Sequence, residues 1–140
     1  MPRNGNPRSL SATVTSWAAR YGRAILRDGV AAIPSALYRY QGVLDLSAQE
    51  VWLIACILAH KWDADLPSPS LSRLAAATGI DGKWLKRLRK RLETKEYLRV
   101  EAVYGESGVQ LPNQYNFAPL FAQLESLLQS DPPGWLRNNI

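Results

Sequence analysis

The sequence predicts a mainly α-helical fold with a small β-hairpin wing, arranged as a winged helix-turn-helix with N- and C-terminal helical extensions. Three observations predict it. Residues 70–78 and 82–95 repeat apolar side chains at helical spacing on either side of Gly79. Residues 97–104 alternate apolar and polar side chains ahead of a glycine-rich tip, which is typical of a hairpin. Basic residues gather on the second helix.

The composition is that of one soluble globular domain with short extensions. The chain has 140 residues, of which 46% are hydrophobic and 21% charged. No apolar run approaches the roughly 20 residues needed to cross a bilayer, and the N-terminus lacks the apolar block of a secretory signal. We therefore expect a cytoplasmic, nucleoid-associated protein with no membrane partner.

The N-terminal extension is expected to be an arm followed by a helix. Residues 1–8, MPRNGNPR, predict a disordered basic arm. Its arginines could contact phosphates or a minor groove, although a free tail is the favoured interpretation. Residues 9–28 predict one helix whose apolar stripe could dock on the same domain or on a second copy, making a homodimer. The stripe contains Leu10, Val14, Trp17, Ala18, Tyr21 and Ile25.

The winged helix-turn-helix domain is expected over residues 29–118. Val30 to Ile33 reads as a short strand that pairs with the wing, and Pro34 then opens a helical turn that runs to Gln41. Ser47 and Glu50 form a capping box. The helix that follows is apolar almost all round, so we expect it to be the most buried.

The sequence gives no reason to expect an enzyme, a metal site or a cofactor. His60 is the sole histidine, and Cys56 is the sole cysteine and lies in an apolar helix, so neither has partners for a metal site. Asp63 and Asp65 read as solvated loop residues. A glycine-rich phosphate loop and a nucleophile with a base are both missing.

The two helices of the motif have matching start and stop signals. Ser70 is placed to cap the first helix, and Asp81 is placed to cap the second. Gly79 can adopt the left-handed conformation that ends a helix, and Ile80 supplies the buried plug of the turn. Helix, turn and helix therefore indicate a helix-turn-helix.

The charge of the chain lies on the second helix. Residues 83–99 hold eight of the seventeen basic residues and two acids, a net charge of +6, so the rest of the chain sums to −1. Leu85, Leu88 and Leu92 fall on one side of this helix, and the cations project from the other. One side is expected to pack, and the other to carry positive charge.

A nucleic-acid reader is the function that this helix predicts, with residues 82–95 in the major groove of double-stranded DNA. Arg87 is the expected base reader, because a guanidinium offers paired donors. Arg89 and Lys95 are expected on the packed side, paired with Glu93, Glu96 or Asp81, and Trp84 is expected to pack. The predicted DNA-binding residues are Ser70, Ser72, Arg73, Lys83, Lys86, Arg87, Lys90, Arg91 and Arg99.

The wing and the last helix complete the prediction. A strand over residues 97–104, a tip over 105–108 and a returning strand to Phe117 predict the hairpin. Residues 119–140 predict a C-terminal helix and tail, whose apolar stripe is a second candidate surface for a homodimer.

Long stretches of the chain resemble the winged helix-turn-helix proteins of bacteria, plasmids and phages that are related to replication-initiator N-terminal domains. The stretches are AIPSALYRYQGVLDLSAQEVWLIACILAHKWD, LPSPSLSRLAAATGIDGKWLKRLRKRLETKEYLRV and NQYNFAPL, within residues 21–124. The resemblance implies DNA binding through the second helix of the motif. The wing departs from it, with Arg99-Val100-Glu101 where a basic pair is usual and Glu106 at the tip.

Two function classes remain open from the sequence. The first is a DNA-binding transcription regulator or a replication initiator, acting alone or as the DNA-reading subunit of a larger replication or regulatory complex. The second is a winged-helix protein-interaction module, which would show no salt-sensitive binding to duplex DNA.

Overall fold

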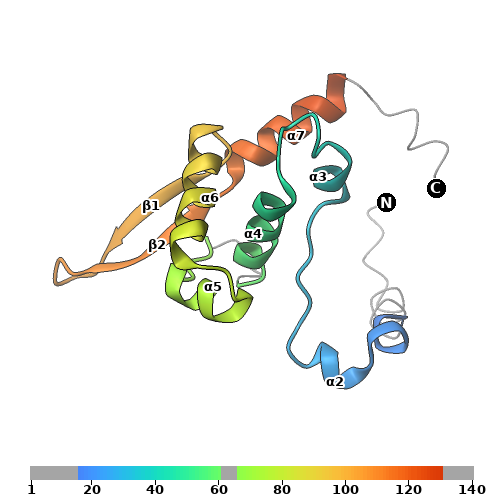
Figure 1. Ribbon diagram of the computed structural model, residues 1–140, viewed down its shortest axis with the longest axis horizontal. Helices are drawn as coiled ribbons and strands as arrows, with labels where there is room; N and C mark the ends of the chain where they lie inside the picture. Colours follow the sequence, from blue (N-terminus) through green and yellow to red (C-terminus); the bar gives the residue numbers. More distant parts are fainter. Residues whose placement is uncertain (1–15, 61–65, 131–140) are drawn as a thin grey trace, which may run out of the picture. The chain divides into compact units, whose positions relative to one another are not determined.

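The computed structural model describes residues 16–60 and 66–130. The chain divides into two units, Met1–Ala31 and Ala32–Ile140, and each is described by itself. The elements in chain order are α2 (Arg23–Leu26), α3 (Ser35–Arg39), α4 (Ala48–Leu58), α5 (Leu71–Thr78), α6 (Gly82–Thr94), β1 (Arg99–Tyr104), β2 (Gln110–Asn116) and α7 (Ala118–Ser130) (Figure 1).

The first unit corrects the prediction of one continuous helix. Residues 16–21 are helical, but Gly22 has a φ of 83° and ends the helix before the short α2 begins. A positive φ lies outside the helical region, and glycine adopts it without a steric cost. None of the side chains of α2 is buried. The predicted arm, residues 1–8, and the predicted start of the helix lie outside the described residues.

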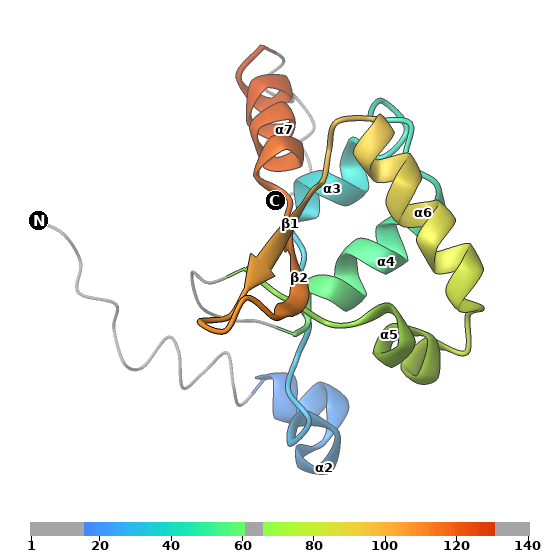
Figure 2. The same cartoon turned by 90° about the vertical axis from the view of Figure 1, so that its left-hand side faces the viewer.

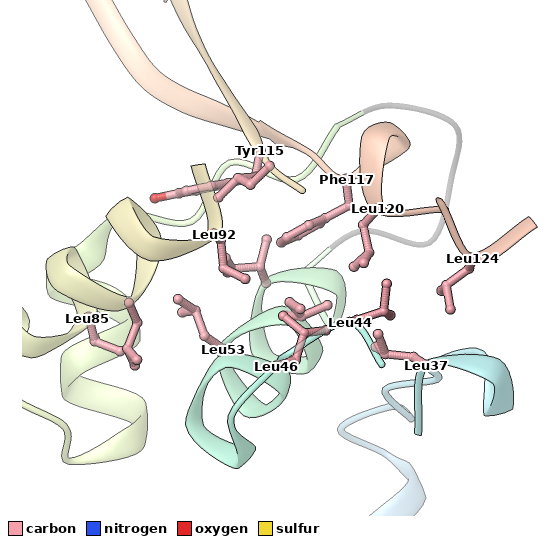
Figure 3. Packing of buried hydrophobic residues seen from close by; sticks show 14 of the residues in the cluster. Leu37, Leu44, Leu46, Leu53, Leu85, Leu92, Tyr115, Phe117, Leu120 and Leu124 are labelled. Carbon is pink, nitrogen blue, oxygen red and sulfur yellow. The ribbon is translucent and has the colours of Figure 1, made fainter. Parts of the chain in front are cut away.

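The second unit has one hydrophobic core to which α3, α4, α5, α6, the hairpin and α7 contribute. Figure 3 shows Leu53 of α4 beside Leu85 and Leu92 of α6, with Leu120 of α7 and Leu37 of α3 extending the same cluster. Helix α4 contributes Leu53, Ile54 and Ile57, all at most 2% exposed.

Helix α4 is less completely buried than its composition predicts. Trp52 is 56% exposed, so one side of α4 faces solvent despite its apolar character. The prediction that α4 is the most buried helix is nevertheless confirmed, because it buries Glu50, Leu53, Ile54 and Ile57, more residues than any other helix in the described part of the chain.

The predicted strand over residues 30–33 does not form. Within the described residues the sheet has two strands, β1 and β2, which pair antiparallel. The amide of Tyr115 in β2 donates instead to the carbonyl of Pro67, at 2.9 Å. The connector before α5 therefore meets the edge of the hairpin at this point.

The helix-turn-helix forms as predicted. The Ser70 hydroxyl accepts a hydrogen bond from the Arg73 amide at 3.1 Å, and the Asp81 carboxylate accepts one from the Lys83 amide at 2.9 Å. Gly79, with a φ of 72°, ends α5 in the left-handed conformation. The Thr78 hydroxyl accepts from the Ile80 amide at 3.2 Å and fixes the turn.

The hairpin follows α6 directly and completes a winged helix-turn-helix. Figures 1 and 2 show it projecting from the helices of the second unit. Val100 pairs with Tyr115 near its base, Val103 pairs with Leu111 farther out, and a register shift lies between Glu101 and Val103. Tyr115 is buried, so the base of the wing is held by the core.

Gly79 and Gly82 offer a matched test of the turn. An added Cβ would meet no atom within 4 Å at either position, but only Gly79 has a positive φ. Gly79→Ala should therefore lower the free energy of unfolding by about 1–2 kcal/mol. Gly82→Ala, at the start of α6, should be neutral or raise it by up to about 1 kcal/mol. Urea unfolding of both variants checks this, and equal losses would contradict it.

Candidate nucleic-acid interface

Helix α6 separates an apolar side from a cationic side. Leu85, Leu88 and Leu92 are at most 1% exposed and pack into the core. The helix carries six basic residues and one acid. Four of the basic side chains are exposed on the side away from the leucines: Lys83, Lys86, Arg87 and Lys90. These four form the surface that we call the cationic face.

One edge of the cationic face borders α4. The indole N–H of Trp84 donates to the Gln49 side-chain oxygen at 2.8 Å, and Trp84 packs against the core, as predicted. The Arg91 guanidinium lies 5.0 Å from the centre of the Trp84 ring, within the range of a cation–π interaction. Arg91 is exposed, and its contact with the indole keeps the guanidinium at this edge of the cationic face.

The other edge borders α5 and the wing. Arg89 is half-buried there and lines a groove with residues of both elements. The expected pairing of Arg89 with Glu93, Glu96 or Asp81 was wrong, because the Arg89 side chain has no hydrogen bond or ion pair in the described part of the chain. Helical spacing places Arg89 next to the leucines, but only the position of the hairpin decides what it faces.

The predicted contacts of α5 lie at its start. Ser72 and Arg73 are exposed, and the hydroxyls of Ser70 and Ser72 are 3.1 Å apart. Because Ser70 also accepts from the Arg73 amide, its hydroxyl oxygen is already used as a helix cap.

Arg99, at the base of the wing, has different surroundings from the other predicted residues. It lines a hollow of about 390 Å³ together with Glu93, Glu96, Leu98 and Pro119. Two carboxylates border this hollow and offset the field of the guanidinium. The remaining eight predicted residues all belong to α5, its cap or α6.

A partly buried ion pair fixes the end of α6. The Lys95 ammonium donates to both oxygens of the Glu50 carboxylate, at 3.0 and 3.1 Å, and also to the carbonyl of Asp45. Lys95 was predicted to pair with Glu93, Glu96 or Asp81, and that was wrong. Glu50 lies 45 residues earlier in the chain, and its burial could not be read from the helical pattern.

Glu50 performs two tasks at once. The Ser47 hydroxyl accepts from the Glu50 amide at 3.1 Å, and the Glu50 carboxylate accepts from the Ser47 amide at 3.0 Å, which confirms the predicted capping box. Burial by itself would raise the pKa of Glu50, which is 2% exposed. The hydrogen bonds from Ser47 and Lys95, with the charge of Lys95, outweigh burial and lower that pKa.

A second contact holds the same end of α6 against the core. The Tyr97 hydroxyl donates to the Leu44 carbonyl at 2.9 Å, just after α6 ends. Lys95 and Tyr97 thus bind the segment between α3 and α4, so the far end of α6 has a fixed place on the core.

No protein-family model and no curated protein matches this chain. Among solved structures, it is similar to the crystal structure of a MarR/EmrR family transcriptional regulator from Acinetobacter sp. ADP1. The TM-score is 0.43 and the sequence identity 17%, over 88% of this chain and 72% of that chain. The assignment of a winged helix-turn-helix rests on the order and geometry of α5, α6, β1 and β2 in this chain.

Other kinds of site have little support in the part of the chain that the structure describes. There, no three His, Cys, Asp or Glu side chains are grouped so that they could hold a metal ion. Cys56 is half-buried, and burial raises the pKa of its thiol. Over residues 16–60 and 66–130, no helix has the length and apolar character to cross a membrane.

The ion pair between Glu50 and Lys95 predicts a specific dependence of stability on pH. Because the pKa of Glu50 is lowered on folding, its stabilisation is complete above the ordinary glutamate pKa of about 4.3. It is lost as the pH falls through the lower pKa of the folded state. Unfolding free energies measured from pH 7 to pH 3 should fall more steeply for the wild type than for Glu50→Gln. Parallel curves would contradict this assignment.

At neutral pH, Lys95→Met should lower the free energy of unfolding by about 1–3 kcal/mol, because it leaves a buried carboxylate without its cation. Lys86→Met, the same change on the cationic face, should stay within about 0.5 kcal/mol of the wild type.

Proposed function

We propose that this protein binds double-stranded DNA in a sequence-specific manner and acts as a transcription regulator, with α6 in the major groove. The observation that supports this most directly is the cationic face on the second helix of a helix-turn-helix. The major groove admits an α-helix, and phosphates attract an exposed row of ammonium and guanidinium groups. Because the leucines are anchored in the core, the cationic face points outward in the folded protein.

The proposed roles follow from side-chain chemistry. Arg87 reads a guanine, because its planar guanidinium can donate two parallel hydrogen bonds to one base. Lys83, Lys86 and Lys90 contact phosphates as point charges. Ser70, Ser72 and Arg73 hold the backbone near the start of α5, with Arg91 at the α4 edge and Arg99 at the base of the wing. Of these, Arg99 has the weakest support, since Glu93 and Glu96 border the same hollow.

The same interface could serve a replication initiator of the plasmid or phage type, or the DNA-reading subunit of a larger nucleoprotein complex. The resemblance to replication-initiator domains is the basis for this alternative. An initiator would use the same interface as a regulator and would differ from it only in where its DNA site lies. Sequencing the DNA fragments that co-purify with the protein separates the two, because an initiator binds repeated sites at an origin and a repressor binds beside a regulated gene.

A protein-interaction module is the second candidate, and one observation favours it. Tyr104 and Val109 of the hairpin are 64% and 63% exposed, and residues 100–117 contain no lysine or arginine. A hairpin that exposes apolar side chains, carries Glu101 and Glu106 and has no cation beyond Arg99 is better suited to a protein than to phosphates. Under this alternative the protein would not bind duplex DNA in a salt-dependent way.

The salt dependence of DNA binding tests the proposal as a whole. If four to six phosphates are neutralised, a plot of log affinity against log salt concentration should have a slope of roughly −4 to −5. Fluorescence anisotropy with a labelled duplex measures this slope. A slope near zero, or an absence of binding, would leave the protein-interaction module as the better function.

Two variants of the cationic face separate base reading from phosphate contact. Arg87→Ala should weaken binding to the preferred site by about 1–3 kcal/mol and reduce the preference for it over unrelated DNA. Lys90→Ala should weaken binding to all sequences similarly. Competition titrations with specific and unrelated duplexes measure both effects. If the two variants lose affinity equally on every sequence, Arg87 is not the base reader.

A further inference from the structure

A groove lies between the start of α5, the wing and the edge of α6 that carries Arg89. Its volume is about 470 Å³. It is lined by Pro69, Ser70 and Leu71 before and at the start of α5, by Arg89 of α6, and by Gln110, Leu111, Pro112, Asn113 and Tyr115 of the wing. None of the nine predicted DNA-binding residues except Ser70 lines it.

Arg89 gives this groove its charge. It is the only charged side chain among the lining residues that the structure describes. Since no carboxylate in the described part of the chain pairs with Arg89, its field is not cancelled locally. A guanidinium presents paired donors that match the oxygens of a carboxylate or a phosphate, so Arg89 can bind such an anion in the groove.

The walls of the groove restrict which anion fits. Pro69, Leu71 and Pro112 provide apolar surface, and Ser70 and Asn113 add neutral polar groups. This combination matches a sugar-phosphate chain, whose deoxyribose is largely apolar and whose phosphate carries the charge. The groove also borders α6, so a DNA strand beside the cationic face would pass close to it.

We propose that this groove holds the DNA sugar-phosphate backbone on the wing side of α6, with Arg89 as the phosphate contact. The inference rests on the proposed function and extends it to a residue outside the cationic face. It also gives a role to the part of the wing beyond Arg99, which lacks cations. From Val100 to Phe117 the hairpin has no basic residue, but it forms one wall of the groove, and the charge comes from Arg89.

Arg89→Gln is the first test, because it removes the charge and keeps much of the length of the side chain. Its affinity for duplex DNA should fall about tenfold, by a similar factor on specific and unrelated sequences. The magnitude of the salt slope should decrease by about 1. Hydroxyl-radical footprinting should show the loss of backbone protection on one side of the site, with the rest of the footprint unchanged.

A second variant tests the groove without changing α6. Gln110→Glu adds a carboxylate to an exposed position of the wing that lines the same groove as Arg89, and it should weaken binding and remove the same protection. Gln123→Glu is the matched control, since it makes the same chemical change at an exposed position of α7 that does not line the groove. Its affinity should stay within about twofold of the wild type. If Arg89→Gln fails to fold, the comparison of Gln110→Glu with Gln123→Glu decides.

The outcomes separate this inference from the proposed function. If Arg87→Ala weakens binding but Arg89→Gln and Gln110→Glu leave the affinity, the salt slope and the footprint unchanged, the groove does not hold DNA and the function stands. If the wild type shows no salt-dependent binding to duplex DNA, both are overturned.

Discussion

The packing of the α6 leucines against α4 is the constraint on which the rest of the second unit depends. Leu85, Leu88 and Leu92 are almost completely buried. Once they occupy the core, the spacing of the helix leaves Lys83, Lys86, Arg87 and Lys90 no direction except toward solvent. Burial of the leucines therefore decides which way the cationic side chains point, although the hydrophobic effect does not act on the cations themselves.

In addition to the leucine packing, the Glu50–Lys95 ion pair fixes where the C-terminal end of α6 lies against the start of α4. Leucine side chains tolerate small rotations and shifts of a helix, whereas the Lys95 ammonium must stay within hydrogen-bond distance of the Glu50 carboxylate and of the Asp45 carbonyl. Because the same carboxylate caps α4, the start of one helix and the end of another share one group. Removal of Glu50 would affect both helices, and the end of α6 would keep only the contacts of Lys95 with the Asp45 carbonyl and of Tyr97 with the Leu44 carbonyl.

The sequence predicted the features that depend on local chemistry. Helix caps, the left-handed glycine and the side of α6 that packs all follow from neighbouring residues, and the structure has them. The break at Gly22 is a local miss, but the other misses depend on contacts between distant residues. Lys95 reaches Glu50, the edge of the wing meets Pro67, and Arg89 faces the hairpin. Spacing along one helix carries no information about these partners. The DNA contacts themselves stay predictions.

The interruption at Gly22 has a consequence for the N-terminal unit. A helix gains most of its stability from the surface that it buries, and short isolated helices are marginal in water. Residues 16–27 form two short helical pieces that expose Trp17, Tyr21 and Ile25. With so little internal packing, the two pieces bury too little surface to be stable as isolated helices in water, so the order of this segment is the most sensitive in the described chain to temperature and denaturant.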